Sequence, residues 1–139
     1  MPVAASVVIT AQDHWTKKGD VNLFLFEKHA TQTPGDKPAG KPGNKPTVLF
    51  VHGSSMASQP TFDLKVPGRP HSSAMDYFVE QGFDTWCVDM EGYGRSDKKR
   101  DINFDISNGV DDLVAATDYI TKTLRNLLYT GNIIYFMHK

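Results

Sequence analysis

The sequence has 139 residues, of which 40% are hydrophobic and 22% are charged. This composition is that of an ordinary globular protein, and the length suits one domain with its own core. The 15 basic and 16 acidic residues give a net charge of −1, which argues against a nucleic-acid partner. We therefore expect a single domain over residues 1–139.

The cysteine content and the N-terminus indicate where the protein works. Cys87 is the single cysteine, so an internal disulfide is excluded, and its place in an apolar strand favours a small core residue. The first ten residues are apolar, but no lysine or arginine precedes Lys17, so they do not resemble a signal peptide. No apolar run approaches the roughly 20 residues that span a bilayer. These features predict a soluble, cytoplasmic protein with no membrane span.

The chain begins with two expected strands and a segment of unusual composition. Val3–Thr10 and Val21–His29 are rich in residues that favour strands, and Lys17–Asp20 between them has the composition of a turn. Since apolar residues lie on both faces of the second strand, we expect this hairpin to be packed on both sides. Residues 33–46 repeat proline, glycine and lysine, which predicts an extended surface loop. A docking segment for an aromatic groove is the alternative.

Strands and helices then alternate. Three short apolar runs predict strands, and the first of them has the continuous apolar character of a strand buried on both faces: Thr47–His52, Asp84–Asp89 and Ile133–Met137. A loop through three prolines follows the first of these strands. A helix over residues 74–79 is expected from the Ser73 cap and from Gly82 at its end, and helical spacing predicts a second helix over Ser107–Tyr129, ended by Gly131. This alternation indicates an α/β fold with a parallel sheet behind the hairpin, although the pattern leaves the strand order open.

The turn after the first buried strand is one candidate site. His52 and Gly53 end that strand, and Ser54 and Ser55 follow. Ligands bind at the carboxyl ends of parallel strands, where two backbone N–H groups can stabilise an oxyanion. A plain strand-to-loop turn with a hydrogen-bonded histidine explains the same residues.

A second segment follows the next strand and carries a specific resemblance. It runs Asp89-Met90-Glu91-Gly92-Tyr93-Gly94-Arg95-Ser96-Asp97, and Asp111-Asp112-Leu113 lies in the helix after it. The order of these features resembles the α/β-hydrolase superfamily: a strand ending in His-Gly, a helix, a strand ending in Asp, and then Gly-Tyr-Gly-Arg-Ser-Asp. The resemblance extends from Val48 to about Ile120, so we expect the N-terminal half of an α/β-hydrolase sheet.

The resemblance implies roles for single residues. His52 and Gly53 would begin an oxyanion-hole loop, and the backbone N–H of Ser54 or Ser55 would be its donor. Gly92 and Gly94 would let the second loop, which includes Tyr93 and Ser96, fold tightly after Asp89. Arg95 and Asp97 would hold that loop in place.

The sequence departs from the family where catalysis would begin. It contains no Gly-x-Ser-x-Gly, the family's nucleophile elbow, and the acid and histidine that follow the elbow have no counterpart. On this alignment, Ile133–Met137 is the strand before the elbow, and His138 is not the family histidine. We therefore expect an incomplete domain that is inactive alone, acts on an ester or amide only when completed by a second half, and needs no cofactor. Its exposed sheet edge is expected to favour self-association.

Three other interpretations remain. Gly53-Ser54-Ser55-Met56-Ala57 nearly fits an elbow and would make Ser55 a nucleophile, although the proline-rich segment after it does not predict the required helix. Gly92-Tyr93-Gly94 could open a dinucleotide loop, but Asp97 stands where the third glycine belongs. The histidines have no metal-ligand spacing. A non-catalytic interaction protein, binding through the proline-rich loop or the sheet edge, is the alternative from another functional class.

Overall fold

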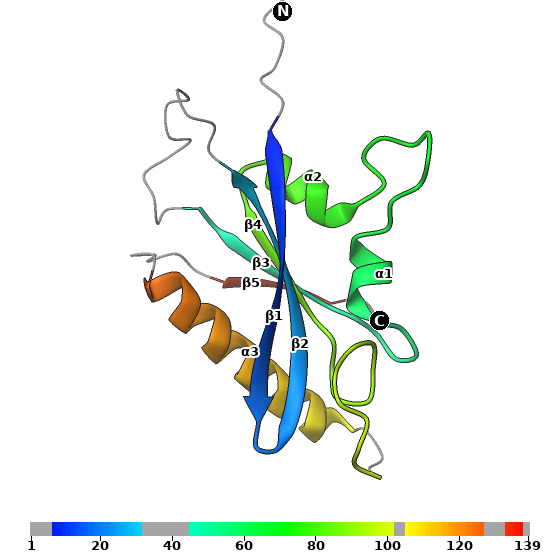
Figure 1. Ribbon diagram of the computed structural model, residues 1–139, viewed down its shortest axis with the longest axis vertical. Coiled ribbons are helices and arrows are strands. Elements are labelled where there is room, and N and C mark those ends of the chain that lie inside the picture. The colour runs from blue at the N-terminus through cyan, green and yellow to red at the C-terminus, as the bar shows by residue number, and fades with distance from the viewer. Residues whose placement is uncertain (1–6, 32–44, 102–104, 127–132, 138–139) are drawn as a thin grey trace, which may run out of the picture.

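The computed structural model describes residues 7–31, 45–101, 105–126 and 133–137, which form one five-stranded sheet and three helices (Figure 1). The strands are β1 (Val8–Lys18), β2 (Val21–Thr31), β3 (Thr47–Val51), β4 (Asp84–Val88) and β5 (Ile133–Met137). The helices are α1 (Ser58–Phe62), α2 (Ala74–Glu80) and α3 (Ile106–Asn126).

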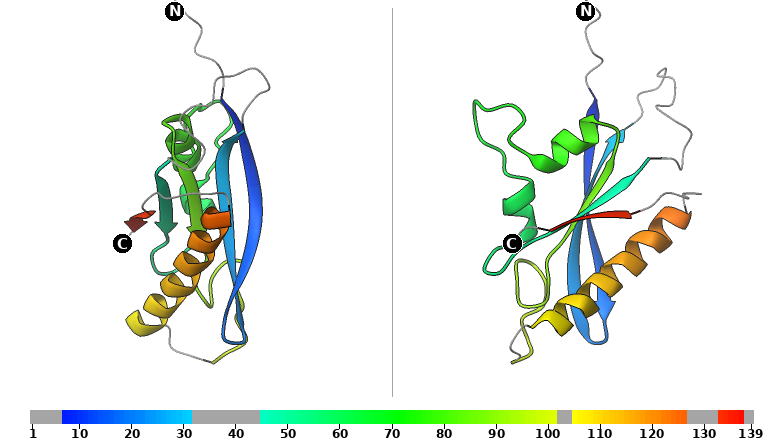
Figure 2. Two further views of the ribbon diagram at one scale, coloured as in Figure 1. Left: turned by 90° about the vertical axis from the view of Figure 1, so that its left-hand side faces the viewer. Right: turned by 180° about the vertical axis from the view of Figure 1, so that it is seen from behind.

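The strand order is β1-β2-β4-β3-β5, with an antiparallel hairpin at one end and three parallel strands at the other. The chain steps from β3 to β4 in one direction, and then passes back over β3 to reach β5. Parallel crossovers are right-handed, so this reversal places the two connections on opposite faces of the sheet. Figure 2 shows the sheet from its edge and from behind, with α3 lying apart from α1 and α2.

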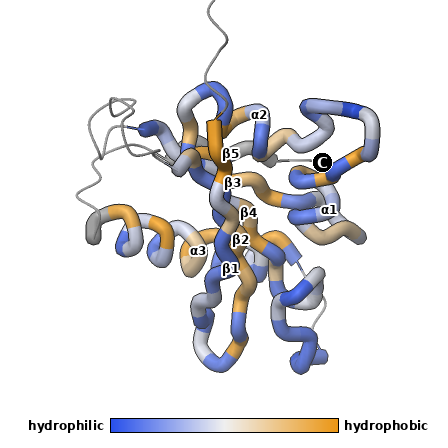
Figure 3. The backbone as a smooth tube through the Cα atoms, turned by 45° about the horizontal axis from the view of Figure 1, so that its top comes forward, coloured by the Kyte–Doolittle hydropathy of each residue, from blue (hydrophilic) through white to orange (hydrophobic). Residues whose placement is uncertain are grey.

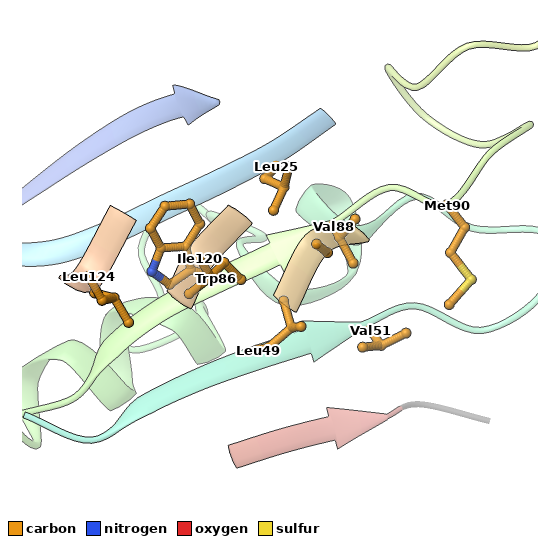
Figure 4. Packing of buried hydrophobic residues seen from close by; sticks show 9 residues of the cluster. Leu25, Leu49, Val51, Trp86, Val88, Met90, Ile120 and Leu124 are labelled. Carbon is orange, nitrogen blue, oxygen red and sulfur yellow. The ribbon is translucent and has the colours of Figure 1, made fainter. Parts of the chain in front are cut away.

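Each face of the sheet has its own apolar core. On one face α3 contributes Ala116, Ile120 and Leu124, which pack against side chains of three strands (Figure 4): Leu25, Leu49, Val51, Trp86 and Val88. On the other face, Phe62 of α1 and Met75 of α2 cover the side chains that alternate with these: Phe24, Phe26, Val48, Phe50 and Cys87. Because successive strand residues point to opposite faces, a strand buried on both faces must be apolar throughout. This explains the continuous apolar run of β3.

Polar groups tie the hairpin to α3. The His14 ring lies 4.6 Å from that of Trp86, its Nε2 is 2.7 Å from Glu27 Oε2, and its Nδ1 is 2.9 Å from the Tyr119 hydroxyl on α3. Although burial opposes it, hydrogen bonds from His29 and His14 hold the pKa of Glu27 below its usual value. The same carboxylate raises the pKa of His29. An anionic Glu27 therefore links both strands of the hairpin to the helix.

The predicted alternation of strands and helices after residue 46 is confirmed. The parallel strands lie within one residue of their expected bounds, and the Ser73 hydroxyl caps α2 by accepting the N–H of Asp76 at 3.1 Å. Gly82 follows the helix with φ +93°, a conformation that glycine adopts at little cost. The predicted end of α3 at Tyr129 and Gly131, and most of the loop over residues 33–46, lie outside the described residues.

Three predictions need correction, two on the N-terminal hairpin and one on the loop after β3. β1 continues to Lys18, well past the predicted end at Thr10, because its polar residues pair with β2 along an exposed edge; residues 3–6 of the predicted strand lie outside the described residues. The hairpin is buried on both faces only in β2, since β1 is mostly exposed. The loop predicted after β3 contains α1, where Pro60 is tolerated because the first-turn N–H groups need no partner within the helix.

Candidate functional site

A cavity of about 390 Å³ lies at the carboxyl ends of β3 and β4. The chain leaves β3 toward one face of the sheet and leaves β4 toward the other, and such a reversal opens a crevice between the two loops. The cavity is mainly apolar. Its walls come from the loop after β3, the loop after β4 and the first turns of α3: His52, Gly53, Ser54, Met90, Tyr93, Asp105, Ile106, Gly109, Val110 and Leu113.

His52 joins the two loops and is fully engaged in doing so. Its Nε2 accepts the N–H of Met90 at 3.0 Å, so the ring proton is on Nδ1, which donates to the Gly53 carbonyl at 2.7 Å. The ring is buried and lies 4.9 Å from that of Tyr93. Because both ring nitrogens are occupied, His52 positions the loops and is not available as a general base.

The turn after His52 presents backbone donors. Ser54 and Ser55 are exposed, and their N–H groups donate to no other residue in the described part of the chain. Ser55 has φ +70°, a left-handed conformation that costs a residue with a Cβ about 1–2 kcal/mol. Strain of this kind persists where the surrounding structure fixes a turn, and it is frequent at functional sites.

Asp89 anchors the loop that faces this turn. Its Oδ1 accepts the N–H of Ser58, the first residue of α1, at 2.8 Å, and its Oδ2 accepts the N–H of Arg95 at 3.0 Å. Gly94 passes so close to this carboxylate that a Cβ there would lie 2.1 Å from Asp89 Oδ2. One buried carboxylate therefore holds both loops, and only glycine fits beside it.

Ser96 and Asp97 attach the same loop to β2. The Ser96 hydroxyl accepts the N–H of Phe24 at 2.8 Å and donates to the Asp89 carbonyl. The Asp97 carboxylate accepts the backbone N–H of Asn22 at 2.8 Å, and this bond lowers the pKa of Asp97 below its usual value. The loop is thus held from both its ends.

Arg95 fixes the outer side of the loop. Its guanidinium lies 4.0 Å from the centre of the Phe24 ring and donates to the carboxylate of Asp13 on β1 at 2.9 Å. Gly92 has φ +88° and donates its N–H to the Asp97 carbonyl at 2.9 Å. In this structure the motif residues thus hold the loop against the sheet, while Tyr93 forms part of the cavity wall.

A buried charge cluster connects the loop to β1 and α3. Glu91 binds Arg100 through two hydrogen bonds of 2.6 Å and Lys18 at 2.8 Å. Lys18 Nζ also lies 2.5 Å from Asp112, whose other oxygen accepts the N–H of Glu91 at 2.9 Å. Burial opposes the charge of Lys18, but its two carboxylate partners outweigh burial and raise its pKa. The hydrogen bond from Arg100, followed by that from Lys18, lowers the pKa of Glu91 to about 2.

The low pKa of Glu91 predicts an acid-labile contribution to stability. Its ordinary pKa is 4.5, so this contribution is complete above pH 4.5 and is lost as the pH falls toward 2. Glu91→Gln is expected to flatten the dependence of the unfolding free energy on pH in that window, as measured by urea unfolding at several pH values. Glu80→Gln, on the exposed end of α2, is the matched control and should retain the wild-type slope. An unchanged slope in Glu91→Gln would contradict this assignment.

Sequence reasoning had no signal for part of the site. Asp105 caps α3, accepting the N–H of Asn108 at 2.9 Å, and borders the cavity together with the side chains of the first turns of the helix. These residues reach the cavity through the packing angle of α3, which no local pattern encodes. The sequence had placed His52, Gly53, Ser54 and Tyr93 in candidate loops, and the structure brings them to one cavity.

The described residues hold a donor turn and an apolar cavity, but no assembled catalytic triad. The Ser55 hydroxyl makes no hydrogen bond to a described residue, and both His52 nitrogens are used elsewhere. No cluster of three potential metal ligands occurs in the described part of the chain. Among the same residues, no helix is both long and apolar enough to cross a bilayer.

Comparison with solved structures identifies the architecture. The chain superposes on the epoxide hydrolase VrEH1 from Vigna radiata with a TM-score of 0.59 and 19% identity, over 94% of this chain. It matches Est1E from Butyrivibrio proteoclasticus, solved with ferulic acid bound, with a TM-score of 0.57 and 21% identity over 91% of this chain. The chain has the α/β-hydrolase fold.

The match covers only part of each α/β-hydrolase. The aligned region is 32% of the epoxide hydrolase and 42% of Est1E. The haloalkane dehalogenase DatA from Agrobacterium tumefaciens C58 gives a similar result, with a TM-score of 0.53, 14% identity and 33% of its chain covered. No protein-family model and no curated protein matches the sequence. The chain therefore spans less than half the length of these α/β-hydrolase structures.

Proposed function

We propose that this chain carries the oxyanion-binding part of a serine hydrolase that acts on an ester or amide bond. The observation that carries the proposal is the pair of N–H groups of Ser54 and Ser55, which have no partner among the described residues. Ser54 lines an apolar cavity at the end of β3, and Ser55 is the next residue of the same turn. Two such donors stabilise the negative charge that develops on a carbonyl oxygen during acyl transfer.

The surrounding contacts favour this assignment. His52 and Asp89 fix the two loops by hydrogen bonds to backbone N–H groups, so the donor turn is held before any substrate arrives. Preorganised donors stabilise charge without the cost of reorienting at the moment of reaction. The sequence contains no Gly-x-Ser-x-Gly, so the nucleophile, its histidine and the acid would have to come from elsewhere. The isolated chain is therefore expected to be inactive.

An anion-binding experiment tests the donor turn without requiring catalysis. Phenylphosphonate, which offers anionic oxygens beside an apolar ring, is titrated into the ¹⁵N-labelled chain, with benzyl alcohol as the uncharged control. We expect phenylphosphonate alone to shift the amide signals of Ser54 and Ser55, and both compounds to shift Met90 and Tyr93. Ser54→Ala should retain the response, because the donor is the backbone. Equal responses to both compounds would contradict an oxyanion site.

A second candidate function places the nucleophile in this chain at Ser55. Two observations favour it: Ser55 has the positive φ of a strained turn, and α1 begins shortly after it, so a strand-turn-helix arrangement is present. Labelling with a fluorophosphonate and peptide mapping would decide the question. Stoichiometric label at Ser55, absent in Ser55→Ala, would establish a complete small hydrolase. We expect no label, because no described histidine contacts the hydroxyl.

A further inference from the structure

The first strand of the hairpin forms an open edge of the sheet. β1 pairs with β2 along all 11 of its residues, and no described strand pairs with its other side. Figure 2 shows β1 as the outermost element on this side of the sheet, with no described helix beyond it. The strand contains neither a proline nor a bulge, two features that commonly prevent an edge from pairing with another chain.

The backbone groups that face the open edge can be assigned from β2. The N–H groups of Asn22 and Phe24 donate to side chains of the loop after β4, and their carbonyls accept N–H groups of the same loop, so both residues point away from β1. Their partners in register are Lys17 and Trp15. In an antiparallel pair such residues point away from each other, so the N–H and C=O groups of Lys17 and Trp15 face the open edge. The same alternation places the backbone groups of Asp13 at this edge.

The same three residues carry complementary side chains. Asp13, Trp15 and Lys17 alternate along β1, so their side chains lie on one face of the sheet, and all three are exposed. Figure 3 shows hydrophilic segments along this strand. The centre of the Trp15 ring lies 5.3 Å from that of Phe24, and the Asp13 carboxylate accepts a hydrogen bond from Arg95 at 2.9 Å. The open edge thus carries an aromatic ring between an anion and a cation.

A second copy of the strand matches this pattern in one register. When two copies of β1 run antiparallel about a two-fold axis at Trp15, each Asp13 lies opposite Lys17 of the other copy, and the two tryptophans face each other. Opposite charges and aromatic pairs directly across from each other stabilise an antiparallel pair. An axis at Asp13 would instead place two carboxylates opposite each other, and an axis at His14 or Thr16 would pair neither charge with its opposite. Charge complementarity therefore selects the axis at Trp15.

We propose that the open edge of β1 binds a second copy of this chain, and that antiparallel pairing about Trp15 joins the two sheets into one. Asp13 then contacts both Arg95 of its own chain and Lys17 of the other, and charges in such a network contribute more than an isolated surface pair. β1 and β5 lie at opposite ends of the strand order, so residues that continue the sheet beyond β5 would be added at the other edge.

Sedimentation velocity of the whole chain over a range of concentrations tests this proposal. We expect a monomer–dimer equilibrium with a dissociation constant on the order of ten micromolar. Asp13→Lys and Lys17→Asp each place like charges opposite each other at two points, so each variant is expected to dimerise at least about tenfold more weakly. Both residues are exposed, so the circular dichroism spectrum should not change. Asp118→Lys and Lys99→Asp make the same charge changes at exposed positions elsewhere and should dimerise like the wild type.

Mixing the two variants tests the register itself. In a mixed dimer, the lysine introduced in one chain faces the aspartate introduced in the other, and the remaining Lys17 and Asp13 face each other. An equimolar mixture of Asp13→Lys and Lys17→Asp is therefore expected to dimerise nearly as tightly as the wild type. A wild-type chain that is monomeric at every concentration would overturn the proposal, and so would a mixture that stays monomeric. A dimer retained by both single variants would also overturn it, because another surface would then hold the copies together.

Discussion

Replacing Gly94 with alanine is expected to destabilise the fold by about 2–4 kcal/mol. The residue has φ +51°, and a Cβ there would lie 2.1 Å from Oδ2 and 2.4 Å from Cγ of Asp89. Asp89 cannot move aside without losing its bonds to the N–H groups of Ser58 and Arg95. The measurement is the unfolding free energy from urea denaturation, and loss of the Ser58 bond should also perturb the start of α1.

Gly92→Ala is the matched control in the same loop. Its φ is +88°, but a Cβ there would meet no atom within 4 Å, so only the backbone conformation is penalised. A cost of about 1–2 kcal/mol is expected. If both variants lost the same stability, the contact with Asp89 would have no role beyond backbone conformation, and the assignment of Asp89 as the anchor of both loops would be wrong.

Lys18→Met is expected to cost about 3–5 kcal/mol, the range for removing one member of a buried ion pair. Lys18 Nζ lies 2.5 Å from Asp112 and 2.8 Å from Glu91, and both carboxylates are nearly inaccessible to solvent. Glu91 would still have Arg100, but Asp112 would keep only the backbone N–H of Glu91. The measurement is the unfolding free energy from urea denaturation at pH 7.

Neutralising Asp112 should then restore stability. In the Lys18→Met background, Asp112→Asn removes the unpaired charge while its side-chain oxygen can still accept the N–H of Glu91. The double variant is therefore expected to be more stable than Lys18→Met alone, in urea unfolding at pH 7. Additive losses from the two substitutions would show that Asp112 and Lys18 do not act as an ion pair.

Much of the fold could be predicted because its central strands carry apolar side chains on both faces. β3 and β4 are almost fully buried, and that burial requires the apolar runs Val48–Val51 and Trp86–Val88. β1 lies at an exposed edge and carries polar residues, so the strand was predicted only as far as Thr10. The strand order could not be predicted, because it depends on which side of β3 the chain returns to, and no local pattern fixes that choice.

The candidate site was only partly predictable. The residues that end β3 and β4 have a distinctive order, so the sequence placed His52 and Asp89 at the ends of successive strands, but it did not predict that the two loops meet. It did not show that both nitrogens of His52 bind the backbone, since that depends on the Met90 N–H from the opposite loop. The apolar wall from α3 was also missed, because Val110 and Leu113 fit helical spacing whether they face a core or a cavity.

The loop after β4 also changes what hydrogen exchange would report. β2 pairs with β4 only from Leu25 to Lys28, and beyond Leu25 the loop takes the place of the strand. There the N–H of Asn22 is held by Asp97 and the N–H of Phe24 by Ser96, both through side chains of the loop. Amides in a strand ordinarily exchange when strands separate, but these two exchange only when the loop lifts. Their protection therefore measures the opening equilibrium of the wall of the candidate site, in a protein whose sheet remains closed.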